Sequence, residues 1–504
     1  MIERYGFDCV KYLEEQSREI EKRIDLFNGK LYLEFGGKLL YDYHACRVLP
    51  GYQPNIKVEL LKRLRDKIDI ILCIYAGDIE KGRIRGDFGV TYDVDALKLI
   101  DDLRNESLDV CAIVVTRFNN QAQVKEFQRK LERRGIKIYL HEATKGYPTD
   151  VDIIVSDKGY GQNSYITTTK PIVVVTGPGP GSGKLATCLS QLYHDYRKGV
   201  RSGYAKFETF PMWNLALKHP VNLAYEAATA DLKDVNMIDP FHLNAYGKSA
   251  VNYNRDIEVF PVVQRILKKI MGEKMVYQSP TDMSVNRAGF AITNDMLVQT
   301  AAKQELIRRY FRHRYEYLIG VSNKGTLEKI ILLMEELDIK PEDRSVIEPA
   351  RREAKILQKR LGNGLLACGA AVELHDGTIV TGKNNPLMSA SSSCVLNAIK
   401  KLAEIPPRID LLPAAILENI ATMKRDILSL KQSVLDLQET LIALSISASA
   451  NPTAAVAMEQ LKSLSGCDMH LTHVPAPGDE VGLRKLRVYL TTDGLFPSKD
   501  LNIS

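Results

Sequence analysis

Short runs of apolar, mostly β-branched residues recur through the first third of the chain, separated by segments with helical periodicity. The runs are IDIILCIY at 68–75, DVCAIVVTRF at 109–118, IKIYLHEA at 136–143, DIIVS at 152–156 and PIVVVTG at 171–177. Their nearly continuous hydrophobicity is typical of strands that are covered on both faces. Strands that alternate with helices in this way predict an α/β fold with a doubly wound, mostly parallel sheet.

The N-terminal segment adds two further elements. Residues 9–26 space their apolar side chains as a helix does, and KLYLEFGG at 30–37 alternates as a strand does, so we expect a helix followed by a hairpin-like strand. Helices are also predicted between the strands, at 94–105 and 121–135, and Gly135 stands where a helix end favours glycine.

The pattern changes after about residue 205, where prolines and polar aromatic segments predict long loops. Amphipathic helices are predicted at 257–272, 296–318, 326–338 and 344–361. The last third predicts strands at 365–374, 379–383, 467–474 and 486–492, a helix at 390–404 and a long helical segment over 411–445. We expect three domains, namely an α/β phosphate-binding domain over 1–235, a polar loop with a helical domain over 236–360, and a smaller C-terminal α/β domain over 361–504.

The composition excludes several classes of protein. Hydrophobic residues make up 45% and charged residues 26%, as in ordinary globular proteins. The net charge of +6 is too small for so long a chain to indicate nucleic-acid binding. Eight scattered cysteines without a CxxC pair are typical of reduced thiols. No apolar run is long enough to span a membrane, so we expect a cytoplasmic protein without a membrane partner.

A glycine-rich loop directly follows the last of these strands and directly precedes a helical sequence. The loop residues we expect to bind phosphate are Gly177, Gly179, Gly181, Ser182, Gly183 and Lys184. Glycines let successive backbone N–H groups point at one anion, the start of the helix adds partial positive charge, and the lysine supplies a full charge. The arrangement resembles the Walker A loop of P-loop nucleotide-binding proteins.

The loop departs from that pattern at two positions. Pro178 stands where the first glycine of the Walker A loop belongs, and Leu185 stands where Ser or Thr would bind Mg²⁺. The nearest substitute hydroxyls are those of Ser182 and Thr187, so a nucleotide with Mg²⁺ stays open as the cofactor. Phosphate binding is compatible with both departures. Standard nucleotide hydrolysis is less well supported, because the Mg²⁺-binding hydroxyl is missing. The alternative is a glycine turn that only tightens the connection between strand and helix.

A second candidate site lies in the polar stretch from 236 to 258. Asp239 could order a cation or a water, Arg255 could bind a carboxylate or phosphate with two hydrogen bonds, and Asp256 or His242 could move a proton. We therefore expect these four residues to be catalytic. The alternative is a polar loop that satisfies its own backbone.

Two other clusters carry weaker signals. In residues 304–317 arginines alternate with aromatic side chains, a combination that can bind nucleic acid. The glutamates in this segment reduce its positive charge and favour an exposed helix face instead. Cys467, His470 and His473 are metal-ligating types, but residues three apart on a strand point to opposite faces. A metal site there needs other ligands, which the sequence does not identify.

Three long strings carry a resemblance to a known family. GPGPGSGK, FETFPMWNLALKHPVNLAYEAATADL and AVNYNRDIEVFP resemble, over essentially the whole chain, the bacterial domain-of-unknown-function family eighteen forty-six. The resemblance implies the same domain order and no particular activity.

The C-terminal part carries a second, local resemblance. Residues 369–372, Asp376-Gly377 and 381–384, with the helix over 390–404, look like the first half of a cytidine deaminase fold. That fold places His or Cys before Ala-Glu at the helix start and a later PCxxC. Here Ser393-Cys394-Val395 lacks the glutamate and no PCxxC follows, so the resemblance implies a deaminase-like domain without deaminase chemistry or catalytic zinc.

Two functions follow from these observations. The first is a phosphate- or nucleotide-binding enzyme, a phosphotransferase or phosphohydrolase, whose partner is a phosphate-containing small molecule. The second is a non-catalytic protein that senses a nucleotide or serves assembly, for example as a homo-oligomer. The two differ in whether an acid or base from 236–258 lies within hydrogen-bonding reach of a phosphate in the loop.

Overall fold

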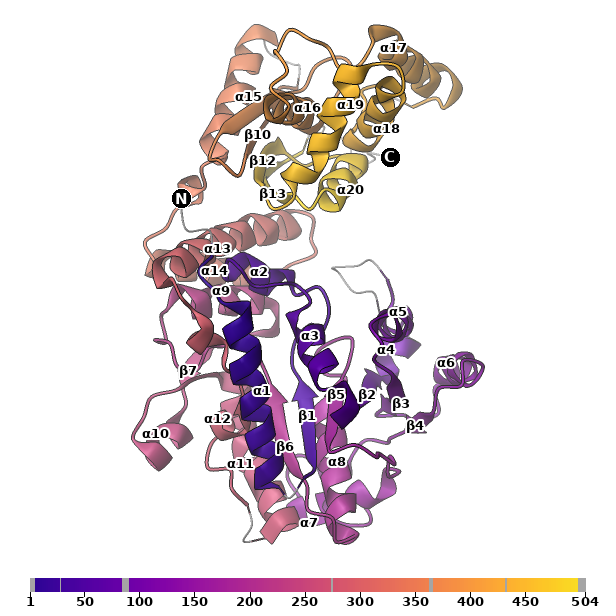
Figure 1. Cartoon of the computed structure of the whole chain (residues 1–504), viewed down its shortest axis with the longest axis vertical. Helices are drawn as coiled ribbons and strands as arrows, with labels where there is room; N and C mark the ends of the chain where they lie inside the picture. The colour runs from indigo at the N-terminus through magenta and orange to yellow at the C-terminus, as the bar shows by residue number, and fades with distance from the viewer. Residues whose placement is uncertain are drawn as a thin grey trace. The chain divides into compact units, whose positions relative to one another are not determined.

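The computed structural model describes residues 5–27, 29–83, 90–272, 275–361, 366–430 and 433–496. The chain divides into two compact units, residues 1–303 and 304–504, whose elements are labelled in Figure 1. Each unit has its own hydrophobic core. Residues 236–303 belong to the first unit, and the three-domain division expected from the sequence stays a prediction.

The first unit is built on a seven-stranded parallel sheet with the order β4-β3-β2-β5-β1-β6-β9. The strands are β1 Leu31–Phe35, β2 Ile68–Tyr75, β3 Val110–Thr116, β4 Ile138–Leu140, β5 Ile172–Thr176, β6 Gly203–Phe207 and β9 Ser284–Val285. All residues of β1 and β5 are buried, as central strands covered on both faces must be. The predicted α/β class with a parallel sheet is confirmed.

The helices of this unit follow the predicted pattern closely at the N-terminus. They are α1 Cys9–Leu26, α2 Tyr43–Val48, α3 Ile56–Arg63, α4 Ala76–Glu80, α5 Tyr92–Asn105, α6 Ala122–Glu132, α7 Val151–Ile154, α8 Lys184–Arg197, α9 Pro220–Ala228, α10 Pro240–Tyr246, α11 Asn254–Met271 and α12 Pro280–Met283. Helix α1 begins where it was predicted because the Asp8 carboxylate accepts hydrogen bonds from the amides of Val10 and Lys11.

The direction of the crossovers reverses in the middle of the sheet. From β2 the chain runs outward to β3 and β4, whereas from β5 it runs through α8 to β6, on the far side of β1. Because such crossovers are right-handed, opposite directions place the connecting helices on opposite faces. The chain therefore leaves the neighbouring strands β2 and β5 toward opposite faces, which is the arrangement at which open α/β sheets bind ligands.

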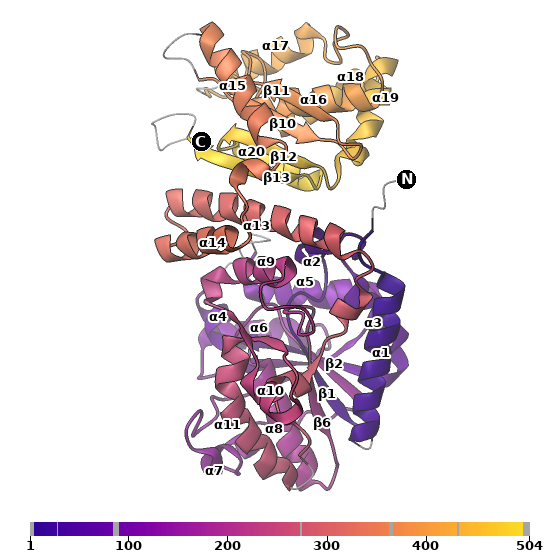
Figure 2. The ribbon, with the colours of Figure 1, turned by 90° about the vertical axis from the view of Figure 1, so that its left-hand side faces the viewer.

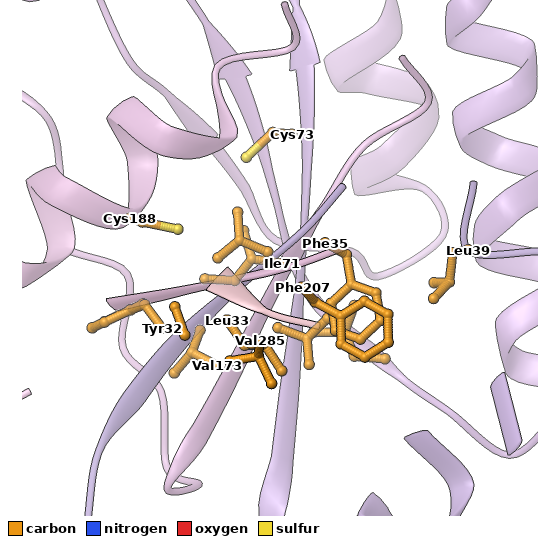
Figure 3. Close-up of a cluster of buried hydrophobic side chains, with 14 of the residues drawn as sticks. Tyr32, Leu33, Phe35, Leu39, Ile71, Cys73, Val173, Cys188, Phe207 and Val285 are labelled. Carbon is orange, nitrogen blue, oxygen red and sulfur yellow. The ribbon is translucent and has the colours of Figure 1, made fainter. Parts of the chain in front are cut away.

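Side chains are packed on both faces of the sheet, and those on one face meet α8. On one face of β1 the Phe35 ring stacks on Phe207, with ring centroids 4.3 Å apart (Figure 3). On the other face Cys73 of β2 and Cys188 of α8 project toward the same space. Helix α8 contacts β1, β5 and β6, and α11 packs against α8 (Figure 2). The start of α8 is thus fixed against the centre of the sheet.

The strand predicted over 30–37 is confirmed as β1, but its hairpin-like pairing was wrong, because β1 pairs in parallel with β5 and β6, both far ahead in the chain. The segment 152–156 was expected to form a strand, but residues 151–154 form α7. The Asp150 carboxylate accepts from the Ile153 amide there, and only Ile154 is buried, so no continuous apolar strand is needed.

Two other segments differ from the sequence prediction in detail. The polar loop expected over 236–258 contains β7 Asn236–Ile238, α10 and β8 Val251–Tyr253, and the two strands pair antiparallel. The long helical segment over 411–445 is divided, because α17 Ala414–Thr422 ends in a π-helical turn at Met423–Ile427 and α18 Leu437–Ala448 starts at its own capping box.

The second unit is a smaller α/β unit with a four-stranded sheet in the order β11-β10-β12-β13. Its strands are β10 Gly369–Glu373, β11 Ile379–Lys383, β12 Asp468–His473 and β13 Tyr489–Leu495. Its helices are α14 Lys324–Glu336, α15 Ile347–Leu361, α16 Ala390–Leu402, α17, α18, α19 Pro452–Glu459 and α20 Pro477–Lys485, while α13 Asp295–Leu318 crosses the unit boundary. Strands β10, β11 and β12 are antiparallel neighbours, and β12 pairs in parallel with β13.

No helix within the described ranges is long and apolar enough to cross a membrane. All eight cysteines of the chain are free thiols, as their scattered spacing predicted.

Candidate functional site

The loop at 177–183 connects β5 to α8 at the reversal point of the sheet. Gly183 is the N-cap of α8 and has a φ of 87°, and a Cβ added there would lie 2.7 Å from the Thr116 side chain. A Cβ on Gly177 would lie 2.5 Å from the carbonyl oxygen of Cys73. Both positions therefore require glycine, the first for its backbone conformation and the second for close packing on β2.

Lys184 reaches back over this loop. Its Nζ lies 3.4 Å from the Gly179 carbonyl oxygen and 3.4 Å from the Ser182 hydroxyl. No side chain caps the start of α8. The first amides of a helix have no partner within it and carry partial positive charge. The ammonium and the helix start therefore present positive charge at the same place.

The end of β3 forms one wall of the loop. Thr116 Oγ1 donates to the Ser182 carbonyl oxygen at 2.8 Å, and the Arg117 guanidinium donates to the Gly181 carbonyl oxygen at 2.6 Å. The same guanidinium lies over the Tyr75 ring, 3.5 Å from its centroid. Arg117 has a φ of 51°, an uncommon backbone conformation for a residue with a side chain. The loop thus has a second cation beside it.

Sequence reasoning missed Arg117. The available signal was its position at the end of the apolar run over 109–118, since the carboxyl ends of parallel strands meet at one edge of the sheet.

Three other residues that were predicted to bind the ligand, Ser182, Thr187 and Gly179, are packed against neighbouring residues of the fold. Ser182 and Thr187 are both buried. Thr187 Oγ1 donates to the Gly183 carbonyl oxygen at 3.0 Å and accepts from the Cys73 thiol at 3.4 Å. A Cβ on Gly179 would meet the Tyr92 ring at 2.5 Å. The hydroxyl of Thr187 is therefore engaged inside the fold.

Asp239 and His242 lie together at one end of α10. Asp239 is fully buried, and its oxygens accept from the amides of Phe241 and His242 and from the amide and hydroxyl of Thr281. The His242 ring lies 3.1 Å from the Ser279 hydroxyl. It also lines a pocket of about 130 Å³, together with Glu19, Arg23, Trp213, Thr281, Asp282, Ser284, Asn286 and Arg287.

Arg255 and Asp256 lie elsewhere, at the start of α11. The Arg255 guanidinium pairs with Asp234 at 3.1 Å and stays half exposed. Asp256 pairs with Lys206 of β6 at 2.5 Å. The four residues predicted in this stretch therefore fall into two pairs with separate partners.

Lys206 is the centre of a partly buried cluster at the carboxyl end of β6. Its Nζ contacts Asp256, the Glu208 carboxylate at 2.8 Å and the Tyr253 hydroxyl, which donates to Glu208 at 2.6 Å. Burial acts to lower the pKa of Lys206, but Asp256 and Glu208 outweigh it and raise that pKa. Burial raises the pKa of Glu208, and Lys206 offsets this only in part.

Sequence reasoning missed Lys206, Glu208 and Tyr253. The signal was the segment GYAKFETF, in which Lys206 and Glu208 share one face of a strand that is otherwise apolar.

The weaker clusters of the second unit have ordinary protein partners. Glu305 is buried and pairs with Arg308 and Arg309. His470 is buried, with Nδ1 2.9 Å from the Thr491 hydroxyl, and burial lowers its pKa. Among the residues that the structure describes, no group of three or more His, Cys, Asp and Glu side chains is arranged to hold a metal ion. The likeness to a deaminase fold stays a prediction.

Comparison with known proteins gives one family for the whole chain. Residues 5–338 match the domain of unknown function DUF1846, N-terminal, and residues 342–502 match its C-terminal counterpart. A UPF0371 protein of Clostridium botulinum strain Kyoto is 57% identical over 498 residues, covering 99% of both chains. A UPF0371 protein of Clostridium tetani strain Massachusetts is 56% identical over the same length and coverage.

Proposed function

Because the chain belongs to the DUF1846 family, whose description carries no activity, we propose from the loop geometry that it binds a phosphate-containing small molecule at residues 177–184. We infer phosphoryl transfer or phosphate-ester hydrolysis as the activity. The alternative is a protein that binds a nucleotide as a signal.

One observation carries this proposal, namely the meeting of two cations with an uncapped helix start at the reversal point of the sheet. The Lys184 ammonium contacts the Gly179 carbonyl oxygen, the Arg117 guanidinium contacts the Gly181 carbonyl oxygen, and α8 begins at Lys184 without a side-chain cap. Helix starts bind phosphate through backbone N–H groups and partial positive charge. Ligands of open α/β sheets bind in the crevice at such reversal points.

The loop favours phosphate over a nucleotide that is bound mainly through Mg²⁺. Leu185 offers no hydroxyl, and Thr187 donates its hydroxyl proton to the Gly183 carbonyl oxygen. In P-loop enzymes a hydroxyl at this part of the loop holds the metal. We therefore expect Mg²⁺ to add little to the affinity of this protein for ATP.

Removal of the Lys184 ammonium tests the proposal. A charge-assisted contact to a bound anion contributes about 1.5 to 3 kcal/mol, so Lys184→Ala should weaken binding roughly ten- to a hundredfold. Calorimetric titration with inorganic phosphate, AMP and ATP, each with and without Mg²⁺, measures the loss. Lys198→Ala is the matched control, because Lys198 caps the other end of α8 and lies over the Tyr165 ring.

The two variants should melt at nearly the same temperature, since neither lysine is part of a hydrophobic core. Equal affinity of wild type and Lys184→Ala for every anion, or no binding by the wild type, would reduce the loop to a structural turn. Release of inorganic phosphate from a bound ester would separate the enzyme from the sensor.

A further inference from the structure

The carboxyl ends of β5, β1 and β6 form a row beside the loop. Glu34 of β1 is in register with Val175 of β5 on one side and with Lys206 of β6 on the other. Two residues further along each strand lie Gly177, Gly36 and Glu208, and the Gly36 amide donates to the Phe207 carbonyl oxygen at 2.9 Å. Since neighbouring strands are about 4.8 Å apart, Gly177 and Glu208 are separated by about 10 Å.

The middle of this row carries no side chain. Gly36 and Gly37 follow β1, and a Cβ added to Gly36 would lie 3.3 Å from Cγ of Glu208. A ligand that extends from the loop therefore meets the Glu208 side chain beside Gly36. The separation of Gly177 and Glu208 is comparable with the length of a phosphate joined to one sugar ring.

The loop and the cluster share one face of the sheet. The Tyr32 hydroxyl donates to Asp195 of α8 at 2.8 Å, and Glu34 lies two residues along β1 on the same face, so Glu34 faces the helix that starts at the loop. The Tyr204 hydroxyl donates to Glu34 at 2.8 Å, and Lys206 lies two residues along β6 from Tyr204, on the same face. The face that carries Lys184 and α8 thus also carries Lys206.

The two ends of the row differ in charge. Lys184 and Arg117 make the loop end cationic. At the other end one ammonium faces two carboxylates, Glu208 at 2.8 Å and Asp256 at 2.5 Å. A second phosphate would be repelled there, and a ligand amine would find the place between the carboxylates taken by Lys206. Neutral hydroxyl groups fit, because they accept from an ammonium and donate to carboxylates.

The cluster is nearly buried but keeps some contact with solvent. The side chains of Lys206, Glu208 and Asp256 are 15%, 8% and 17% exposed. Their mutual hydrogen bonds hold them in place before a ligand arrives.

We infer that the ligand is a phosphate ester of a polyhydroxy compound, with its phosphate in the loop at 177–184 and its hydroxyls on Lys206, Glu208 and Asp256. This inference rests on the proposed function. The cluster recognises the sugar part and separates the ester from free phosphate. A hexose phosphate and a ribonucleotide are two sources of this chemistry.

Titration of four compounds tests the inference on the full chain. The probes are inorganic phosphate, glucose 6-phosphate, AMP and unphosphorylated glucose. Wild type should bind at least one of the two esters about tenfold or more tighter than inorganic phosphate, and glucose should bind far more weakly. The ester whose affinity exceeds that of inorganic phosphate by the larger factor shows whether the ligand is a hexose phosphate or a ribonucleotide.

Asp256→Asn keeps the shape of the side chain and removes the carboxylate that faces Lys206. It should erase most of the gain for the ester and leave the affinity for inorganic phosphate unchanged, whereas Lys184→Ala weakens both. Glu258→Gln is the matched control, because Glu258 is exposed on the same helix. Tyr253→Phe, which removes one hydroxyl from the cluster, replaces Asp256→Asn if that variant does not fold.

The outcomes separate the two proposals. If wild type binds phosphate and both esters equally, or if Asp256→Asn or Tyr253→Phe weakens phosphate and ester alike, the sugar site is wrong and the phosphate loop stands. If none of the phosphorylated probes binds, both proposals fail.

Discussion

A buried histidine in the first unit couples its stability to pH. His141 follows β4, is 2% exposed, and its Nε2 lies 3.0 Å from the Ser164 carbonyl oxygen. Burial is the main cause that lowers the pKa of His141 from 6.5 to about 4, and His194 nearby adds to it. The folded protein therefore holds His141 neutral at pH values where the unfolded chain binds a proton.

We predict that this proton reduces stability on the acid side. The contribution of neutral His141 is fully present above pH 6.5 and is lost as the pH falls from 6.5 toward 4, because the unfolded chain binds the proton first. The cost is about 1.4 kcal/mol for each pH unit below 6.5. The unfolding free energy of wild type should therefore fall by about 2 kcal/mol by pH 5, whereas that of His141→Gln should not show this decrease. Urea unfolding at pH 7, 6 and 5 measures the difference.

A second histidine provides the control. His375 makes the same kind of contact, with Nε2 3.0 Å from the Ser465 carbonyl oxygen, but it is exposed. His375→Gln should follow wild type at every pH. Identical pH dependence of wild type and His141→Gln would show that the burial of His141 does not control its protonation.

At the scale of elements, the position of α8 is fixed at both ends. Its start is held by the loop, and near its end Asp195 is fully buried. Asp195 accepts from Lys30 Nζ at 2.9 Å, from the Tyr32 hydroxyl at 2.8 Å and from the Tyr165 hydroxyl at 2.9 Å. One carboxylate thus joins the helix to the central strand.

We predict that Asp195→Asn destabilises the first unit by about 3 kcal/mol, because it leaves the nearly buried Lys30 ammonium without a counter-charge. Thermal unfolding measures the loss. Asp157→Asn is the control, since Asp157 pairs with Arg197 of the same helix in an exposed position and such pairs contribute less than about 1 kcal/mol. Equal melting of the two variants would mean that Lys30 finds water or another partner.

The sequence predicts the positions of helices and strands better than it predicts which strands pair in the sheet. Helix α1 and the strands at 68–75 and 171–177 were placed almost to the residue, because periodicity and caps are local. The partners of β1 were missed, since β5 and β6 lie about 140 to 170 residues ahead and only tertiary packing selects them. The strand predicted at 152–156 was wrong for a local reason. Residues 151–154 form a short helix in which only Ile154 is buried, so these apolar side chains are not part of a sheet.

The candidate site shows the same limit. The loop at 177–184 was proposed as a site because its residues are contiguous, whereas the strands that carry Arg117 and Lys206 come near it only through the strand order of the sheet. Asp256 was selected by residue type, but its partner Lys206, 50 residues away, gives it a role that spacing does not contain.

At the scale of the whole molecule, the main hydrophobic cores of the two units share no residue among those that the structure describes. Units with separate cores are able to unfold in separate steps. The only tryptophan of the chain, Trp213, lies in the first unit, and its indole donates to the Asn286 carbonyl oxygen. Tryptophan fluorescence therefore follows the first unit, while far-UV circular dichroism follows both.

We predict that phosphate stabilises only the first unit. A ligand at about 100 times its Kd adds about 2.7 kcal/mol, which for a unit of this size raises the melting temperature by about 5 °C. The fluorescence transition should shift by that amount, a separate dichroism transition should stay in place, and Lys184→Ala should abolish the shift. Matched sodium chloride controls for ionic strength. A single transition that moves with phosphate in both signals would mean that the two units unfold together, and a shift that survives Lys184→Ala would locate the anion outside the loop.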